Sequence, residues 1–436
     1  MNHRRVVVTG IGLVTSLGKD VATNWKNLVQ GESGAQTITN FDASKFKTQF
    51  ACEVKDLDIS SIFDRKEARR YDRFTHLAIY SAEEAMNDAQ LQMDKEDPLR
   101  CGVIYGSGMG GVHTLDVNIA GFGAGDGTPR YSPFFIPSII TNIAAGVLAI
   151  RYGFCGVNYA TTSACASSSH AIANAYYQIC MGMADVMITG GSEAASECSG
   201  IGGFNALHAL STRNDDPQRA SRPFSASRDG FVLGEGAGTL ILEEYEHAKA
   251  RGAHIYAEIV GVGLTCDAYH MTASDPEGVG AQHAMRLAIQ HAGIAPNKID
   301  YINTHGTSTP IGDIAEVKAI KNVFGEHAYN ISLTSSKSMT GHLLGGTGAV
   351  EAIISILSMQ HGIVTPTINH EEGDEDPNID YKLNFTFNRA QQRDIHYAMS
   401  NNFGFGGHNA CLLFKKPISN NQYPITAKTR LCRTIY

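Results

Sequence analysis

A cysteine and two histidines, all in loops rich in small residues, are the part of this sequence best suited to covalent chemistry. Cys165 lies in the stretch Thr-Thr-Ser-Ala-Cys-Ala-Ser-Ser-Ser-His, where an apolar helical pattern begins. A cysteine at a helix N-terminus meets the positive end of the helix dipole, which favours the nucleophilic thiolate. The alternative is a small core thiol, because free cysteine is commonly buried. The position of Cys165 alone leaves both interpretations open.

The two histidines follow in the second half of the chain. His305 comes directly after an apolar strand, in Asn-Thr-His-Gly-Thr, and His342 ends the stretch Lys-Ser-Met-Thr-Gly-His. Imidazole accepts a proton, or donates one to a developing negative charge, near neutral pH. A single histidine is usually structural, but two in equivalent glycine-and-hydroxyl loops are harder to explain in that way. We therefore predict one site that joins Cys165, His305 and His342.

The strands that must position these loops occur in the same order in both halves of the chain. An apolar strand at 6–8 is followed by the turn Gly10–Gly12, and residues 257–263 repeat the pattern. The next strands are expected at 102–106 and 300–304. Each half closes with a glycine-rich turn and a strand, at 239–242 and 410–414. The repeat means either tandem domains or one pseudo-symmetric domain, and alternating strands and helices predict an α/β fold with sheets covered by helices.

Apolar residues at i, i+3, i+4 and i+7 predict helices, because this spacing forms one helical face. The faces are Ile172, Ala175, Tyr176 and Ile179 behind Cys165; Val350, Ile353, Ile354 and Leu357 behind His342; and Met285, Ala288, Ile289 and Ala292. Ligand sites in such folds favour the C-terminal ends of strands, where loops converge. The loops of the cysteine and both histidines are of this kind.

Composition narrows the class of protein. The chain has 436 residues, 43% of them hydrophobic and 18% charged, which is typical of a globular protein with a large core. No apolar segment is long enough to span a membrane, and no signal-like segment precedes the first strand, so we expect a soluble, cytoplasmic protein. The net charge of −8 disfavours nonspecific binding to nucleic acid.

Cofactor and metal motifs are weak or missing in the sequence. The nine cysteines are scattered without a C-x-x-C pair, which argues against a disulfide framework and a structural zinc site. We therefore predict no metal. The Gly10-Ile11-Gly12 turn lacks a full G-x-G-x-x-G, so dinucleotide binding has little support.

A basic stretch at 64–73 is a candidate docking surface. Its helix-like pattern places Arg65, Arg69 and Arg73 at i, i+4 spacing. Such a stripe is usually a solvated face, which is the favoured interpretation, but on an acidic protein it could also bind an acidic carrier. The residues proposed for carrier docking are Arg65, Lys66, Arg69 and Arg70.

Taken together, four motifs make the chain resemble a known family from about residue 4 to residue 415. They are Ala164–Ala166, Asn303–Pro310, Lys337–Gly345 and Asn402–Gly407. In this order they are similar to the β-ketoacyl-[acyl-carrier-protein] synthases of the elongating type, most of all synthase II. The resemblance implies a thiolase-like fold, with two pseudo-symmetric halves in layered αβαβα architecture, that works as a homodimer. We expect a first half at 1–254 with the cysteine, a second at 255–416 with both histidines, and a surface tail at 417–436.

The resemblance also implies a reaction. Cys165 would take an acyl chain from acyl-carrier protein as a thioester, and carrier-bound malonyl would lose carbon dioxide and attack it. The product is a 3-oxoacyl chain two carbons longer, as in fatty acid biosynthesis. His305 and His342 would stabilise the enolate. No external cofactor is implied, because the substrates bring phosphopantetheine on the carrier.

Other roles carried over by the resemblance belong to residues around these three. The backbone amides of Cys165 and Phe405 would form the oxyanion hole, with Phe405 as gatekeeper between the acyl pocket and the malonyl site. Lys337 would order the histidines electrostatically, with Glu351 as its partner. The remaining assignments are Thr307 and Thr309 to phosphopantetheine and Met109 to the acyl pocket.

The sequence departs from the family pattern at two places. His408-Asn409 follows Phe-Gly-Phe-Gly-Gly where the family usually has Thr-Asn, and an imidazole there could alter the gate loop. The cysteine loop continues Ala-Ser-Ser-Ser-His instead of the commoner Ala-Thr-Ser/Gly-Ala-His. Neither change removes a catalytic group.

Three alternatives stay open. A synthase I-type or polyketide condensing enzyme would use the same chemistry on other chains. A chain-length-factor-like subunit is disfavoured because such subunits lack the nucleophile that Cys165 supplies. A cysteine hydrolase would use one Cys–His pair and would leave Lys337 and the second histidine without roles.

Overall fold

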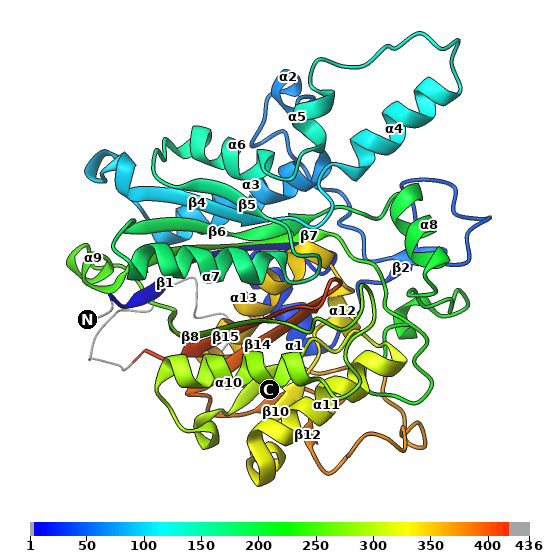
Figure 1. Cartoon of the computed structure of the whole chain (residues 1–436). Helices are drawn as coiled ribbons and strands as arrows, with labels where there is room; N and C mark the ends of the chain where they lie inside the picture. The colour runs from blue at the N-terminus through cyan, green and yellow to red at the C-terminus, as the bar shows by residue number, and fades with distance from the viewer. Residues whose placement is uncertain (1–3, 418–436) are drawn as a thin grey trace.

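One 11-stranded sheet runs through residues 4–417, which a computed structural model describes (Figure 1). Its order is β12 (Asn384–Phe385), β10 (Ser332–Thr334), β9 (Tyr301–Asn303), β14 (Tyr397–Gly404), β15 (His408–Lys415), β8 (Ala257–Cys266), β1 (Val6–Thr15), β7 (Gly236–Glu244), β6 (Val186–Glu193), β4 (Cys101–Gly106) and β5 (Asn158–Thr161). The antiparallel pair β1–β8 joins the two halves through three residues of each strand.

The predicted duplication is confirmed by the strand order on either side of this junction. Reading outward, the first half has β1-β7-β6-β4-β5 and the second has β8-β15-β14-β9-β10. In each half the opening and closing strands are antiparallel neighbours, and the remaining strands pair in parallel. The chain is therefore one pseudo-symmetric α/β unit, and β12 is an additional strand at one edge.

Helices cover the sheet in layers, as expected for an αβαβα fold (Figure 1). The middle layer is α7 (Ser167–Cys180) with α13 (Thr347–His361); the outer layers are α3 (Arg73–Ala89) with α6 (Ile143–Tyr152), and α10 (Val279–Ala292) with α11 (Pro310–Phe324). The apolar face predicted for α7 is buried against that of α13 in one core cluster. Nearly all of α13 is buried, because it lies between the two halves of the sheet.

Three predicted glycine turns are wrong. Gly10 and Gly12 lie inside β1, Gly261 and Gly263 lie inside β8, and Gly236 and Gly238 lie inside β7. Helices cross the strands too closely for a side chain: a Cβ on Gly12 would lie 1.9 Å from the carbonyl oxygen of Ser81 in α3. The glycines therefore serve helix–sheet packing, a recognised use of glycine within strands.

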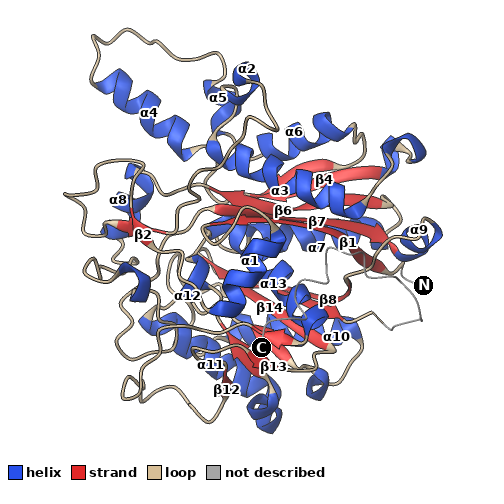
Figure 2. Cartoon of the chain, turned by 180° about the vertical axis from the view of Figure 1, so that it is seen from behind, coloured by secondary structure: helices blue, strands red, loops and turns tan. Residues whose placement is uncertain are grey.

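The remaining elements are short and lie around this frame. They are α1 (Val21–Gln30), α2 (Arg65–Ala68), α4 (Val112–Gly123), α5 (Phe135–Ile139), α8 (Cys198–Ala206), α9 (Tyr245–Ala250), α12 (Lys337–Thr340), β2 (Gln36–Thr37), β3 (Phe50–Ala51), β11 (Ile363–Val364) and β13 (Gln391–Gln392). Helix α4 and the loop after it project from the body as an arm, which is clear from behind (Figure 2).

The predicted domain boundary falls in the segment between α9 and β8. The predicted tail lies outside the described residues apart from Pro417. Across residues 4–417, no helix has both the length and the apolar character needed to cross a bilayer.

Candidate active site

Cys165 lies at a strained turn directly before α7, at the helix N-terminus that the sequence predicted. The preceding residue, Ala164, has φ +50°, a left-handed conformation that is uncommon for a residue with a side chain. The hydroxyl of Ser167 fastens the turn by donating to the Ala164 carbonyl (2.7 Å) and accepting from the N–H of Ser163 (2.9 Å). Ser167, one of the departures from the family pattern, therefore supports the nucleophile turn.

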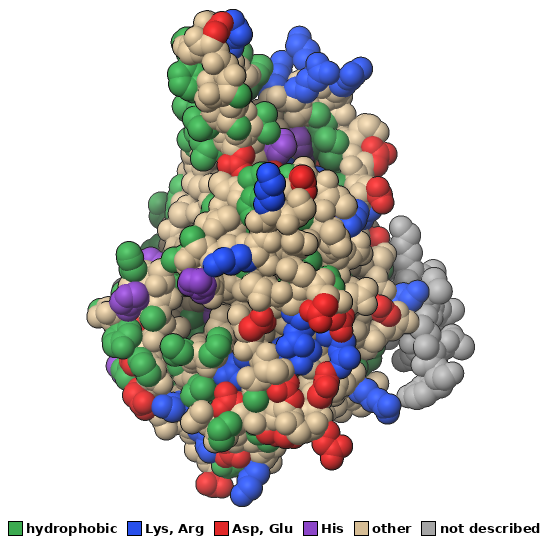
Figure 3. All heavy atoms as spheres, turned by 90° about the vertical axis from the view of Figure 1, so that its right-hand side faces the viewer, with side chains coloured by type: hydrophobic (Ala, Val, Ile, Leu, Met, Phe, Trp, Pro, Cys, Tyr) green, Lys and Arg blue, Asp and Glu red, His purple; other side chains and the backbone are tan. Residues whose placement is uncertain are grey.

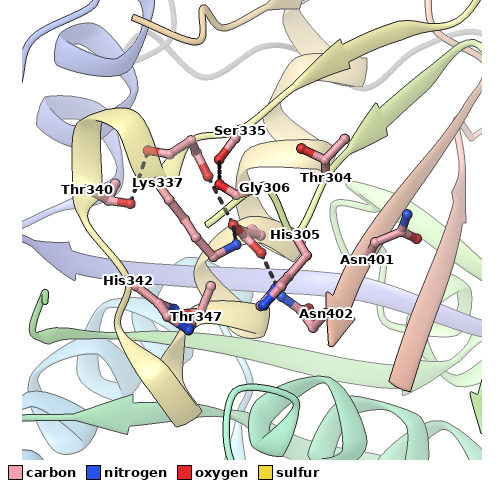
Figure 4. A network of polar contacts seen from close by, with 12 residues as sticks. Thr304, His305, Gly306, Ser335, Lys337, Thr340, His342, Thr347, Asn401 and Asn402 are labelled. Atoms are coloured by element: carbon pink, nitrogen blue, oxygen red, sulfur yellow. Dashed lines mark hydrogen bonds and ion pairs between the residues drawn. The ribbon is translucent and has the colours of Figure 1, made fainter. Parts of the chain in front are cut away.

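His342 faces the thiol from the equivalent position of the second half. Its Nε2 lies 3.0 Å from Cys165 Sγ, and its Nδ1 lies 3.0 Å from the hydroxyl of Thr347 (Figure 4). The side chain is buried, and Phe231 packs edge-on against the ring. This geometry allows the thiol proton to pass to the imidazole, as nucleophilic catalysis by cysteine requires.

His305 completes the group from the loop after β9. Its ring centroid is 5.5 Å from that of His342, and its Nδ1 has no hydrogen-bond partner among the described residues. The carboxylate of Glu316 holds the loop by accepting the N–H groups of His305 and Gly306, each at 2.8 Å. The predicted union of Cys165 with both histidines is therefore present, and their ligand atoms lie within 4.8 Å of one another.

A buried ion pair lies behind the histidines. Lys337 Nζ contacts Glu351 Oε1 at 2.5 Å, and both side chains are 1% exposed. The other oxygen of Glu351 accepts from the side-chain amide of Asn402 at 2.7 Å. The pairing of Lys337 with Glu351 is thus as the sequence predicted.

The charges and burial of the site set the protonation states. Burial and the positive charge of Lys337 hold the pKa values of His305 and His342 well below the ordinary value of 6.5, so both rings are neutral at pH 7. Burial also raises the pKa of the Cys165 thiol to about 11, which outweighs the opposing effects of Lys337 and of nearby backbone N–H groups. The N–H groups at the helix start therefore act in the direction that the sequence predicted, but burial raises the pKa by more than they lower it.

Two backbone N–H groups point to the thiol, those of Phe405 and of Cys165 itself, and both act to lower its pKa. These are the two donors proposed for the oxyanion hole. The loop that carries Phe405 approaches closely because Gly404 has no side chain: a Cβ there would lie 2.7 Å from the Ser163 carbonyl oxygen. The Phe405 ring is half-buried and lies 6.5 Å from the ring of Phe204, and its role as a gate stays a prediction.

The predicted pantetheine and acyl-pocket residues lie on neighbouring loops. Thr307 and Thr309 are close to each other, with their hydroxyl oxygens 3.0 Å apart. Met109 is on the loop after β4, and its side chain is 41% exposed. These assignments also stay predictions.

The predicted basic stripe is broken between its second and third arginines. Helix α2 ends at Ala68, and Asp72 caps the start of α3, so Arg73 belongs to a different helix. Arg73 Nε binds Glu235 at 2.8 Å instead of facing solvent with the others. Arg65, Lys66 and Arg69 are exposed, and the Arg70 guanidinium lies over the Phe134 ring. Lys and Arg side chains gather at the height of α2, beside the projecting arm (Figure 3).

His408, the departure in the gate motif, lies in β15 and not in the turn that we predicted. Its ring meets that of His170 edge-on, with centroids 6.3 Å apart. His170 in turn lies 2.8 Å from the hydroxyl of Ser163, at the start of the nucleophile turn. The His408 ring therefore joins β15, the strand after the gate loop, to helix α7 through its contact with His170.

Sequence reasoning missed two buried acids that organise the site, Glu316 and Glu193. Glu193, at the end of β6, accepts hydrogen bonds from the loop after β4 and from Gly345 N. Burial raises the pKa of each carboxyl to about 7, against the lowering effect of the N–H donors. The available signal was an acid within or directly after an apolar run, as in Val-Met-Ile-Thr-Gly-Gly-Ser-Glu.

Cysteine and histidine are common metal ligands, and the ligand atoms of Cys165, His305 and His342 lie close enough to share an ion. Their spacing in the sequence is not that of a known metal motif. The ammonium of Lys337 acts on all three groups and opposes a divalent cation there. The absence of a metal stays a prediction.

Family models and known proteins are similar to this chain over most of its length. Residues 3–248 match the family model "Beta-ketoacyl synthase, N-terminal domain", and residues 256–371 match "Beta-ketoacyl synthase, C-terminal domain". A 3-oxoacyl-[acyl-carrier-protein] synthase 2 of Staphylococcus aureus is 50% identical over 95% of this chain and 99% of its own length.

Two solved structures are also similar. A beta-ketoacyl synthase from Burkholderia phymatum has a TM-score of 0.87 and 37% identity, covering 95% of this chain and all of its own. A ketosynthase bound to the hexaketide and in complex with its type II polyketide acyl-carrier protein has a TM-score of 0.86 and 34% identity, covering 96% and 100%. The chain belongs to the beta-ketoacyl synthase family, whose members are condensing acyltransferases.

Proposed function

We propose that the chain is a 3-oxoacyl-[acyl-carrier-protein] synthase of type 2, which elongates acyl chains in fatty acid biosynthesis. The observation that carries the proposal is the placement of a protonated thiol 3.0 Å from a neutral imidazole, with a second neutral imidazole beside them. The 50% identity to synthase 2 relatives across nearly the whole chain favours this role over a synthase I-type or polyketide enzyme.

In the first half-reaction, Cys165 Sγ attacks the acyl thioester of the carrier while its proton passes to His342 Nε2. The tetrahedral oxyanion lies against the N–H groups of Cys165 and Phe405. Its collapse leaves an acyl group on Cys165 and returns the carrier as a free thiol, which takes up the proton. Neutral His342 suits this step because it can accept a proton at pH 7.

In the second half-reaction, malonyl on its carrier loses carbon dioxide, and the remaining electron pair forms an enolate. His305 and His342 would stabilise the enolate charge by donating hydrogen bonds to the thioester oxygen. For His342 this requires the tautomer with the proton on Nε2, in which Nδ1 accepts from the Thr347 hydroxyl. The enolate carbon attacks the acyl group, and Cys165 leaves as a thiolate that is reprotonated. Thr307 and Thr309 would hold the phosphopantetheine arm, Met109 would line the acyl pocket, and no further cofactor is required.

The central test uses acyl-carrier protein and malonyl-carrier protein as substrates. Cys165→Ala should abolish formation of the 3-oxoacyl product. Cys165→Gln should also lose condensation but retain malonyl decarboxylation, because both histidines survive. Condensation by Cys165→Ala at the wild-type rate would refute the mechanism, and free acid released faster than condensed product would favour a hydrolase. Preferred elongation of long unsaturated chains would separate type 2 from the alternatives.

We also propose that the exposed basic residues of α2 and its C-terminal end dock the acidic carrier. The support is their exposure beside the arm, together with a similar ketosynthase solved in complex with its acyl-carrier protein. Arg65→Glu with Arg69→Glu should raise the KM for carrier substrates about tenfold, mainly at low salt. Lys298→Glu with Lys382→Glu, at two exposed lysines far along the chain, is the control with the same change of net charge. Equal effects of the two reversals would refute the docking surface.

We propose further that the enzyme is a homodimer in the cytoplasm. Strand β5 is an edge strand, with a neighbour on one side. The arm and the following helix α5 expose large apolar side chains such as Val117 and Ile136, 56% and 59% accessible. Both features suit a second copy of this chain. Ile136→Asp should shift the sedimentation coefficient toward the monomer; an unchanged dimer would refute this interface. The eight cysteines among residues 4–417 are free thiols, which suits a reducing compartment.

A further inference from the structure

Glu193 is a fully buried carboxylate beside the active site to which the mechanism above gives no role. It ends β6, and four donors surround it. Oε1 accepts from the Ser107 hydroxyl and the N–H of Met109, both at 3.1 Å. Oε2 accepts from the N–H of Gly108 at 2.7 Å and of Gly345 at 3.0 Å. Because every partner donates, these contacts favour the ionised carboxylate and oppose the burial that raises its pKa.

The four donors come from two loops that belong to opposite halves of the chain. Ser107 to Met109 follow β4, and Gly345 comes three residues after His342. The loops touch closely: a Cβ on Gly345 would lie 2.2 Å from the nitrogen of Gly108, and one on Gly108 would lie 3.6 Å from the carbonyl oxygen of Ala164. Glu193 thus lies where the acyl-pocket loop, the His342 loop and the nucleophile turn converge.

The negative charge of Glu193 also reaches the nucleophile, since it acts to raise the pKa of Cys165. The Ser107 carbonyl accepts a hydrogen bond from the hydroxyl of Thr162 at 3.0 Å, which ties the pocket loop to the segment leading to Cys165. A shift of the pocket loop would therefore change the space beside the thioester without removing a reacting group.

We propose that Glu193 is a positioning residue that holds the Ser107–Met109 loop against the His342 loop and so sets how long an acyl chain Cys165 accepts. The inference rests on the proposed function. With Met109 lining the acyl pocket as proposed above, long chains would pass this loop, whereas short chains would end before they reach it. Loss of the carboxylate should therefore impair transfer of long chains more than transfer of short ones.

Glu193→Gln is the direct test, because it keeps the shape and replaces one oxygen by an N–H2 group. The N–H2 group of glutamine can donate but cannot accept. In place of Oε1 it would face the N–H of Met109, and in place of Oε2 it would face two N–H groups, so in either orientation two donors face each other. Glu84→Gln is a matched control, since Glu84 is a half-buried carboxylate that likewise accepts two backbone N–H groups, those of Leu13 and Val21. Glu84 contacts no residue of the site.

The readout is the rate at which hexadecanoyl-carrier and hexanoyl-carrier acylate Cys165, followed by mass spectrometry below the Tm of each variant. Glu193→Gln should lower the long-to-short ratio of kcat/KM about tenfold, the effect of losing hydrogen bonds to a charged group, whereas Glu84→Gln should leave it unchanged. Ser107→Ala removes one of the four donors and should lower the ratio by less. This variant replaces Glu193→Gln as the test if Glu193→Gln does not fold.

An unchanged ratio in Glu193→Gln, or in Ser107→Ala where that variant replaces it, would overturn the inference while leaving the proposed function intact. An equal change in Glu84→Gln would overturn it as well, because the effect would then be general destabilisation. If the wild type acylates Cys165 with neither chain, the proposed function itself fails, and the inference fails with it.

Discussion

The buried pair of Lys337 and Glu351 allows stability and catalysis to be separated. Lys337→Met leaves the Glu351 carboxylate buried without its cation, and removal of one member of such a pair costs about 3 to 5 kcal/mol. A chain of this length has an unfolding entropy of roughly 0.9 kcal/mol/K at its Tm, so a loss of about 4 kcal/mol lowers Tm by about 4 to 5 °C. Calorimetry at pH 8 would measure this shift.

The double variant with Glu351→Gln removes both charges and keeps an oxygen for the amide of Asn402. We expect its Tm to return to within about 2 °C of the wild type, because no uncompensated charge remains. Condensation should fall in both variants, since Lys337 no longer adds to the effect of burial in holding the pKa values of His305 and His342 down.

The single variant should also respond to pH in a defined direction. Burial raises the pKa of Glu351 and Lys337 lowers it, so removing the lysine raises that pKa further. Protonation then relieves the buried charge, and the Tm difference from the wild type should shrink as pH falls from 8 to 6. Full condensation activity in the double variant would refute the assigned role of Lys337, and equal Tm values for the single and double variants would refute the coupling of the pair.

The other predictions concern the thiol, the imidazoles and the gate. Alkylation of Cys165 by iodoacetamide should accelerate with pH up to about 11, the value to which burial raises its pKa, and a plateau below pH 9 would contradict this. Malonyl decarboxylation by Cys165→Gln should be constant from about pH 6.5 to 8.5, because both histidine pKa values lie well below 6.5; a midpoint near 7 would count against neutral imidazoles. Gly404→Ala should slow acyl transfer about tenfold, since its Cβ would meet the Ser163 carbonyl oxygen at 2.7 Å. Gly203→Ala, where a Cβ meets nothing within 4 Å, is the control, and equal rates in the two would argue against the close approach.

The sequence by itself determined the identity of the reacting groups and the repeated order of the elements. Cys165, His305 and His342 each occupy a loop whose small residues and neighbouring apolar runs are local features, and local patterns are readable without coordinates. The apolar face of α7 was predictable for the same reason.

The tertiary structure decided everything that depends on residues far apart in the chain. Gly12 lies in a strand at the point where the backbone of α3 crosses it and leaves no room for a side chain. Arg73 lies apart from the other arginines of the basic stripe and binds Glu235. The roles of Glu193 and the protonation of Cys165 follow from loops and burial contributed by both halves of the fold. Hydrogen-bond partners and desolvation are set by distance in space, and a one-dimensional pattern does not record that distance.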